Sequence, residues 1–359
     1  MTKTILIAGA TGVVGHTALE YFAASGEWEA IAVSRRKPDC IDPFEHIAVD
    51  LTDEARCRDV FGGRADVSHV VYTALHEKQW KGPWPEPDPV GANLDMLRNL
   101  LEPLLASGGI EHVTLLQGTK AYGVHMREIP APAKERWPRF EHENFYWAQE
   151  DYIRERQAGQ RWHWTIFRPQ IIFGYSIGSA MNLIPAIGAL AAICREENRP
   201  MGFPGTSSSV LEAADARLLA RAFEWAATAD AGHDDIFNIT NGDIFIWPNV
   251  WPTIAAALNV ATEPGNAVSL RDLFRDKASV WDEIVRKHGL RPLRLHELVG
   301  RSDFYADMGF NFGADRSGPR LVSTIKIRQS GFGECLDTED AFAYWLNRYI
   351  EQGVLPPVE

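Results

Sequence analysis

Apolar residues in the first half of the chain form short continuous runs, separated by longer stretches with helical periodicity. The runs that predict strands are "TILIAG" (4–9), "EAIAVS" (29–34), "HIAVD" (46–50), "SHVVYTA" (68–74), "HVTLLQG" (112–118) and "HWTIFRP" (163–169). They are continuous rather than alternating, as expected of strands buried on both faces of a sheet. Helical patterns lie between them at 14–25, 54–61, 91–107 and 144–158. This alternation predicts an α/β fold with a doubly wound parallel sheet.

The pattern changes after residue 170, where Gly, Pro and Ser become frequent in "RPMGFPGTSSS". One later run, "DIFNIT" (235–240), predicts a strand that returns to the sheet, and most of the remaining sequence is helical in character. We therefore expect a sheet domain over 1–175, with the returning strand near 235–240. We expect 176–359 to form a smaller, mainly helical substrate-binding region that covers the C-terminal edge of the sheet.

Composition narrows the possible functions. The chain has 359 residues, of which 45% are hydrophobic, and its formal net charge is −12. An acidic chain repels polyphosphate, so nucleic acid is not an expected partner. The four cysteines lack a CxxC pair and the histidines form no HxH or HExxH motif, so we expect reduced thiols and no metal site. The apolar stretch 179–194 contains Asn182 and Pro185 and is short for a membrane span, so it predicts a buried or pocket-lining helix.

The start of the sequence, "KTILIAG", predicts a strand and lacks the long apolar core of a signal peptide, so we expect a cytoplasmic protein.

Three glycines then follow in a G-x-x-G-x-x-G spacing, between the first strand and the first helix. Glycine permits a tight turn and lets the backbone approach a pyrophosphate, which rests on the helix N-terminus. A structural turn is the alternative, but the strand–turn–helix context favours a Rossmann-type dinucleotide site. The segment predicted to bind the cofactor comprises Gly9, Thr11, Gly12, Val13, Val14 and Gly15.

The end of the second strand distinguishes NAD from NADP. An acid there would accept hydrogen bonds from the ribose 2′-hydroxyl, but the sequence has Ser34, Arg35 and Arg36. A guanidinium grips a 2′-phosphate with two hydrogen bonds. Asp39 lies beyond Pro38, too far along to replace the acid. A solvated basic turn is the alternative interpretation, and we favour NADP(H).

Further cofactor contacts are predicted at the ends of the third and fourth strands. Asp50 is placed to accept a hydrogen bond from the adenine amino group, and Leu51, Thr73 and Ala74 are assigned to the same site. The alternative is that Asp50 is the N-cap of the following helix, a role that Thr52 could also take.

A reductase needs a group that stabilises negative charge on oxygen while hydride arrives. Tyr146, at the head of the predicted helix 144–158, is one candidate. Lys120, just past the fifth strand, is another, because open α/β sheets bind ligands at that edge. Taken singly, Tyr146 would more often be a core residue and Lys120 a solvated one; their joint placement at the same edge favours catalysis.

The usual Tyr-x-x-x-Lys pair of short-chain dehydrogenases is absent from the sequence, and the residue four after Tyr146 is Glu150. We interpret Glu150 as a surface acid paired with Arg154 at i,i+4. Tyr152 with Arg156, and Tyr344 with Arg348, have similar spacing, but arginine does not replace lysine, so both tyrosines are read as structural.

The chain resembles the progesterone 5β-reductase/iridoid synthase-like enone reductases, a branch of the extended short-chain dehydrogenases. The resemblance covers nearly the whole chain and rests on "GATGVVG", "VSRR", "VDLTD", "LLQGTKAYG", "ENFYWAQED", "FRPQIIFGYS", "MNL", "FNITNGDIFIW" and "VWDEIVRKHGL". The tyrosine motif and the separate lysine motif are specific to that family. The other motifs are weaker or more widely shared.

The resemblance implies NADPH-dependent 1,4-reduction of a small apolar enone or enal, with hydride delivered to the β-carbon. Tyr146 and Lys120 would stabilise the enolate, Arg35 and Arg36 would bind the 2′-phosphate, and Ile172 would contribute backbone contacts beside the nicotinamide. A homodimer is the assembly it suggests. Plant members usually have a second tyrosine where this chain has Trp147, and Gly-Pro after "KHYx" where it has "KAYGVHM". Their substrates therefore do not transfer to this chain.

Three other functions fit the sequence less well. "GYSIG" (174–178) matches the G-x-S-x-G nucleophile elbow of hydrolases, but Pro169 and "QIIF" interrupt the strand–turn–helix context that the motif needs. A carbonyl reductase or sugar epimerase of the same superfamily would be expected to keep Tyr-x-x-x-Lys. A non-catalytic NADP-binding regulator would need neither Tyr146 nor Lys120.

Overall fold

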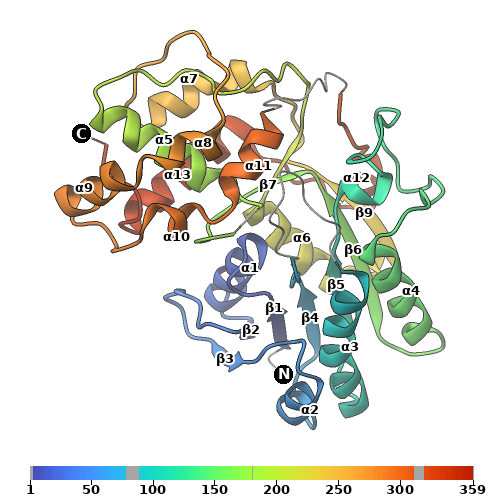
Figure 1. Cartoon of the computed structure of the whole chain (residues 1–359). Coiled ribbons are helices and arrows are strands. Elements are labelled where there is room, and N and C mark those ends of the chain that lie inside the picture. Colours follow the sequence, from blue (N-terminus) through green and yellow to red (C-terminus); the bar gives the residue numbers. More distant parts are fainter. Residues whose placement is uncertain (1–2, 78–88, 180, 311–318, 359) are drawn as a thin grey trace. The chain divides into compact units, whose positions relative to one another are not determined.

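A computed structural model describes residues 3–77, 89–179, 181–310 and 319–358 (Figure 1). The chain divides into two compact units, each built from segments that are separate in sequence. The first unit comprises 1–170, 217–239 and 322–333, and the second comprises 171–216, 240–321 and 334–359. The first unit thus takes in helix α6 (Ala216–Thr228) and the segment around helix α12 (Ile325–Gln329), both of which fall within the region 176–359 that was expected to be a separate helical part.

The first unit contains a parallel sheet that has seven strands within the described residues, in the order β3-β2-β1-β4-β5-β6-β9. The strands are β1 (Lys3–Ala8), β2 (Trp28–Ser34), β3 (Glu45–Ala48), β4 (His69–Tyr72), β5 (His112–Leu116), β6 (His163–Pro169) and β9 (Asp235–Ile239). Each matches a predicted run to within two residues, and the returning strand pairs with β6. The predicted doubly wound parallel sheet is therefore confirmed.

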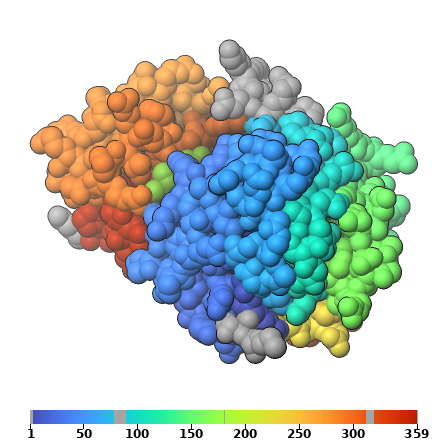
Figure 2. Space-filling view, turned by 90° about the horizontal axis from the view of Figure 1, so that it is seen from below, coloured from blue at the N-terminus to red at the C-terminus, as the bar shows by residue number. Residues whose placement is uncertain are grey.

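Helices cover both faces of this sheet (Figure 1). One face carries α1 (Val13–Ala24) and α6 (Ala216–Thr228), which are tied together because Glu224 accepts hydrogen bonds from Tyr21 and from the Trp28 indole. The other face carries α2 (Glu54–Phe61), α3 (Val90–Ser107) and α4 (Phe145–Gln157). These three helices follow one another across the surface in Figure 2, from blue through cyan to green. Their apolar faces pack on the sheet through residues such as Phe61, Leu100 and Ile153.

The outer edge of the sheet is covered rather than left open. Beyond β9 lies α12 (Ile325–Gln329), where Lys326 donates hydrogen bonds to Asp235 and to the Ile236 carbonyl. A bridge between Ala133 and Val322 holds the segment after β5 to the same edge. Such cover removes the unpaired backbone groups that an edge strand offers to other chains. Two short 3₁₀ helices, η1 (Thr119–Tyr122) and η2 (Asp230–Gly232), complete this unit.

The second unit is mainly helical, with one small parallel sheet of β7 (Ile171–Phe173) and β8 (Ala213–Asp215). Its helices are α5 (Ile184–Glu196), α7 (Trp247–Ala257), α8 (Leu270–Arg275), α9 (Ala278–His288), α10 (Leu295–Val299), α11 (Ser302–Gly309) and α13 (Thr338–Glu351). They surround a core that includes the fully buried Trp247, Trp281 and Trp345. Helix α5 is buried along most of its length, as predicted for 179–194. None of the described helices has the length and apolar character needed to cross a bilayer.

Candidate active site

The glycine loop joins β1 to α1, at the point where β1 lies between β2 and β4. Gly9 has a φ of +86°, a conformation that side chains other than glycine rarely adopt. A Cβ on Gly9 would meet the backbone of Thr73 and Ala74 at 2.9 and 2.8 Å, and a Cβ on Gly15 would lie 2.3 Å from the Gly9 carbonyl oxygen. The predicted glycine loop and the predicted residues after β4 therefore pack directly against each other.

The N-terminus of α1 lies at the topological switch point of the sheet. Chain order reverses between β1 and β4, and open α/β sheets bind ligands in the crevice at such a point. The helix has Gly12 as its N-cap, without a side-chain cap, and Val13 and Val14 fill its buried first turn. The first N–H groups of a helix lack intrahelical partners and favour an anion. Thr11 is half-buried in the loop itself.

The basic residues after β2 are exposed, whereas Ser34 is buried. The Ser34 hydroxyl donates a 2.6 Å hydrogen bond to the Arg36 carbonyl, which fixes the turn that carries Arg35 and Arg36. The Asp39 carboxylate lies 2.9 Å from Nε2 of the buried His16 on α1. An acid held by α1 in this way leaves the exposed turn after β2 basic.

Asp50 follows β3 and its carboxylate forms a local turn. Oδ1 accepts hydrogen bonds from the backbone N–H and the hydroxyl of Thr52, which lower the pKa of Asp50, and Arg35 adds a smaller effect in the same direction. The N-cap of α2 is Asp53, which accepts from the Arg56 N–H at 3.0 Å. The alternative capping role suggested for Asp50 or Thr52 is therefore wrong. Both are occupied with each other, one turn before the helix starts.

Two other predicted cofactor residues are Leu51, which belongs to the first unit, and Ile172, which belongs to the second. Leu51 is buried, and its carbonyl accepts a 2.8 Å hydrogen bond from Asn99 on α3. Ile172 lies on β7 of the second unit, where it is half-buried and pairs with Ala214.

Lys120 lies on η1, directly after β5, and Tyr146 is the second residue of α4. The side chain of Asn144 links them: its Oδ1 accepts the Tyr146 N–H at 3.0 Å, and its Nδ2 donates to the Lys120 carbonyl at 3.4 Å. Asn144 is also the N-cap of α4, a role for which asparagine is among the preferred residues. One capping side chain therefore fixes the turn of Lys120 against the helix start that carries Tyr146.

The Tyr146 hydroxyl lies beside Gly118, where an added Cβ would be 3.4 Å away. Gly118 is two residues before Lys120 and is the N-cap of η1. The neighbouring Gln117 donates a 3.1 Å hydrogen bond to the Tyr146 carbonyl. Tyr146 is thus held at the C-terminal end of β5 through its backbone, with its hydroxyl beside Gly118.

Glu150 is buried, so its interpretation as a surface acid is wrong. Its side chain is only 4% exposed and contacts three guanidinium groups: Arg139 at 2.8 Å, Arg168 at 3.1 Å and Arg154 at 3.2 Å. Burial alone would raise the pKa of Glu150, but Arg139 and Arg168 hold it below its usual value. The pair with Arg154 exists, but it is the outer part of a buried cluster. The sequence feature that indicates this buried cluster is Arg168, a charged residue inside the otherwise apolar run "HWTIFRP".

Trp147, the departure from the plant pattern, is part of the same cluster. Its ring lies 4.9 Å from the Arg139 guanidinium and 5.4 Å from that of Arg168. The indole N–H is buried and finds no hydrogen-bond partner among the described residues. Tryptophan is the aromatic residue that attracts cations most strongly. In this position, Trp147 shields the arginines around Glu150.

The serine of "GYSIG" has no nucleophile-elbow geometry. Ser176 is buried, its N–H donates to the Tyr349 hydroxyl at 2.8 Å, and its carbonyl accepts from the same hydroxyl at 2.6 Å. Asn182 donates to its Oγ at 3.2 Å. A short strand leads into this segment, but no helix follows the serine as an elbow requires. The segment therefore has a structural role, joining β7 to α13.

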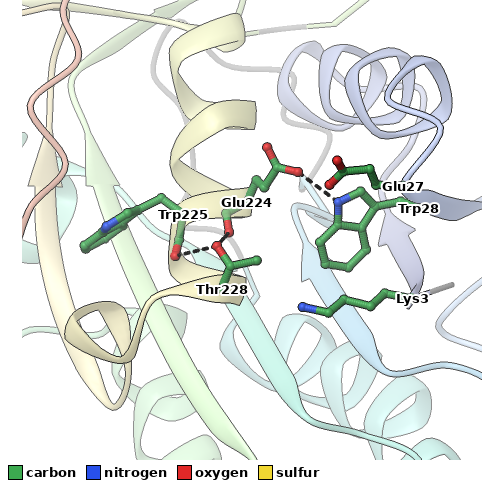
Figure 3. Close-up of a pocket in the computed structure, with 6 residues that line it drawn as sticks. All are labelled: Lys3, Glu27, Trp28, Glu224, Trp225 and Thr228. Atoms are coloured by element: carbon green, nitrogen blue, oxygen red, sulfur yellow. Dashed lines mark hydrogen bonds between the residues drawn. The ribbon is translucent and has the colours of Figure 1, made fainter. Parts of the chain in front are cut away.

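A cavity of about 440 Å³ lies at the opposite edge of the sheet, where β1 and β2 begin (Figure 3). It is lined by Lys3, Glu27, Trp28, Glu224, Trp225 and Thr228. The Trp28 indole already donates to Glu224, and Lys3 lies 5.3 Å from the Trp28 ring. This cavity is therefore separate from the C-terminal edge that carries the glycine loop and Tyr146. The described residues hold no group of three or more His, Cys, Asp or Glu placed to bind a metal ion.

Comparisons with known proteins identify the family of this chain. The family model of the PRISE-like Rossmann-fold domain matches residues 88–317. The chain is 31% identical to the (S)-8-oxocitronellyl enol synthase of Antirrhinum majus, covering 98% of this chain and 92% of that protein. It is 30% identical to the 3-oxo-Delta(4,5)-steroid 5-beta-reductase of Arabidopsis thaliana, with the same coverage.

Solved structures with the same fold are more distant in sequence. The Bordetella bronchiseptica enzyme WbmH in complex with NAD+ superimposes with a TM-score of 0.68 at 15% identity, over 99% of this chain and 100% of that one. UDP-glucose 4-epimerase from Bifidobacterium longum in complex with NAD+ and UDP also gives a TM-score of 0.68 at 15% identity, over 98% and 99% of the two chains. At this identity the likeness establishes the Rossmann-type fold alone.

Proposed function

The chain belongs to the family of PRISE-like Rossmann-fold proteins, and on that premise we propose that it is an oxidoreductase that uses NADPH to reduce the activated C=C bond of an enone or enal. The relatives named as an enol synthase and as a steroid 5-beta-reductase support this class of reaction. The observation that carries the proposal is the Asn144 link, which holds Lys120 and Tyr146 at one strand end without a Tyr-x-x-x-Lys motif.

The cofactor site that we propose is the turn between β1 and α1. The close approach of Gly9, Gly15 and Thr73 leaves no room for side chains, as a backbone that lies against a pyrophosphate requires. Arg35 and Arg36 would bind the 2′-phosphate of NADPH in place of the acid that binds NAD. NADPH, when bound, supplies the hydride for the reduction.

In the proposed reaction, hydride adds to the β-carbon of the enone and the C=C electron pair moves toward the carbonyl, leaving an enolate oxygen. The Tyr146 hydroxyl donates a hydrogen bond to that oxygen, and the Lys120 ammonium adds positive charge beside it. The enolate then takes a proton from water at the α-carbon and becomes the saturated ketone or aldehyde. Proton relay along a Tyr-x-x-x-Lys pair is not needed, which agrees with the acid at position 150.

The position of the transferred deuterium tests this proposal. The protein is incubated with 2-cyclohexen-1-one and NADPH labelled with deuterium on the transferred face of C4. We expect cyclohexanone with deuterium on the β-carbon. Deuterium on the carbinol carbon of an allylic alcohol would instead identify a carbonyl reductase, and no oxidation of NADPH with any of a panel of enones and enals would contradict the proposed class of reaction.

A further inference from the structure

Arg168 is a buried arginine on β6 that contacts both segments that carry the proposed catalytic pair. Its side chain is 5% exposed. On the strand side, its Nε donates to Gln117 Oε1 at 3.0 Å and its guanidinium lies 5.2 Å from the ring of Tyr122. On the helix side, its Nη2 donates to Glu150 at 3.1 Å and the group lies 5.4 Å from the ring of Trp147. One cation therefore joins four side chains from two segments.

The strand-side contacts bracket Lys120 in the sequence. Gln117 precedes η1, and Tyr122 is its last residue. Tyr122 is itself fixed, because its hydroxyl donates a 2.7 Å hydrogen bond to the buried Asn238 of β9. Arg168 thus holds the turn of Lys120 at both of its ends.

The helix-side contacts lie just after Tyr146 on α4. Trp147 and Glu150 follow it by one residue and by one turn of α4. Gln117 connects Arg168 to Tyr146, since its Oε1 accepts a hydrogen bond from Arg168 while its Nε2 donates one to the Tyr146 carbonyl at 3.1 Å. Displacement of Arg168 would release the amide that holds the backbone of Tyr146.

We propose that Arg168 is a positioning residue for the reduction, and that Glu150 is the buried counter-ion that fixes its guanidinium. This inference rests on the proposed function of Lys120 and Tyr146. The position that carries lysine in Tyr-x-x-x-Lys enzymes carries, in this chain, the anion that orients Arg168. Arginine is required because a planar guanidinium serves Gln117 and Glu150 at once, which the single ammonium of lysine does not reproduce.

A double-mutant cycle between Arg168→Lys and Tyr146→Phe tests the inference, with kcat for 2-cyclohexen-1-one reduction as the readout. We expect Arg168→Lys to lower kcat at least about tenfold in the wild-type background, because small misplacements of catalytic groups reduce turnover strongly. The KM for NADPH should change less than about twofold, since Arg168 contacts none of the predicted cofactor residues. In the Tyr146→Phe background the same substitution should lower kcat at least about threefold less than in the wild type, because the hydroxyl of Tyr146 is already absent and only the positioning of Lys120 remains to be lost.

Arg156→Lys is the matched control: Arg156 lies on α4, is half exposed and pairs with Glu102. It should leave kcat unchanged.

If Arg168→Lys does not fold, Gln117→Glu replaces it, because the glutamate keeps an oxygen for Arg168 but removes the donor to the Tyr146 carbonyl. Equal losses from Arg168→Lys, or from Gln117→Glu, in both backgrounds would overturn the positioning role. An inactive wild-type protein would contradict the proposed function instead, so the two failures are distinct.

Discussion

The carboxylate of Glu150 accepts a 3.1 Å hydrogen bond from the guanidinium of Arg168, and the two side chains are only 4% and 5% exposed. The ion pair lies one helical turn from Tyr146. Glu150 also neutralises Arg139, which reaches it from the segment before α4. A buried acid with several cationic partners therefore stands where a short-chain dehydrogenase of the usual type has its lysine.

Loss of this acid should destabilise the fold. Removing one member of a buried ion pair leaves an uncompensated charge and typically costs about 3–5 kcal/mol. We expect Glu150→Ala to lower the free energy of unfolding, measured by urea denaturation, by about that amount. The control is Glu54→Ala, because Glu54 pairs with Arg58 on the surface and both side chains are about 70% exposed; an exposed pair is worth about 0–1 kcal/mol. Similar small losses in both variants would contradict the buried network.

Glu150→Lys offers a sharper comparison. It completes a Tyr-x-x-x-Lys sequence but places an ammonium against Arg139 and Arg168. We expect a loss of stability larger than that of Glu150→Ala and no gain of carbonyl-reductase activity. The alcohol product, assayed with cyclohexanone and NADPH, would reveal such a gain.

Tyr146→Phe and Lys120→Met should each slow turnover without unfolding the protein. Removal of one donor to a developing oxyanion typically costs about 3 kcal/mol, or roughly 100-fold in kcat. Steady-state kinetics and thermal denaturation together separate the two effects. Tyr152→Phe is the control on the same helix, since its hydroxyl donates to Glu102 and its ring lies in the core. Wild-type rates in both catalytic variants would remove Tyr146 and Lys120 from the mechanism.

The basic turn after β2 should determine the choice of cofactor. Arg35→Ala combined with Arg36→Ala should raise the KM for NADPH at least about 10- to 100-fold, because the loss of even one hydrogen bond between charged groups costs about 1.5–3 kcal/mol. The KM for NADH should stay nearly constant, since NADH lacks the 2′-phosphate. Arg58→Ala, which removes an exposed charge elsewhere on the same unit, is the control. Equal affinity of the wild-type protein for the two cofactors would contradict the argument.

Acid should weaken the first unit through a row of histidines at the start of its strands. His69 and His112 are paired in register, and burial lowers the pKa of His69 to about 4 and that of His112 well below its usual value. The unfolded chain binds these protons at its ordinary pKa of about 6.5, so their contribution is complete above that pH and is lost as the pH falls toward 4. For His69 alone, the loss is about 3 kcal/mol.

Urea denaturation between pH 7.5 and pH 4.5 measures this slope. His69→Phe should flatten it, because the phenyl ring takes up no proton. His296→Gln, a change at an exposed histidine of the second unit, should leave it intact. An unchanged slope in His69→Phe would show that other groups control acid stability.

Much of the fold could be predicted because buried parallel strands produce apolar runs with little ambiguity. Strand β9 was placed 66 residues after β6 on this basis, and its pairing is confirmed. The membership of α6 and α12 in the first unit could not be read in the same way. Both helices pack on the sheet through side-chain contacts between distant segments, such as Glu224 with Trp28 and Lys326 with Asp235, and periodicity carries no information about partners.

The candidate site shows the same limit. Motif spacing and chain order were enough to assign Lys120 and Tyr146 to one edge of the sheet. The environment of Glu150 depends on Arg139 and Arg168, which lie 11 residues before it and 18 residues after it. A helical pattern predicts only which face of a helix is apolar. An acid that is buried through salt bridges is therefore assigned to the solvent-exposed face. An arginine within an apolar strand was the available indication that a buried anion must lie opposite.

Strand β9 is synthesised long after β6, and this delay leaves the edge of β6 unpaired during translation. On the ribosome, β6 is complete once Pro169 has emerged, but the strand that pairs with its outer side begins only at Asp235, and the helix over that strand begins only at Ile325. Until then, the nascent chain presents an open row of backbone donors and acceptors, a surface prone to pair with other chains. Translation speed across the segments 170–234 and 240–324 therefore sets how long newly made molecules are vulnerable to aggregation.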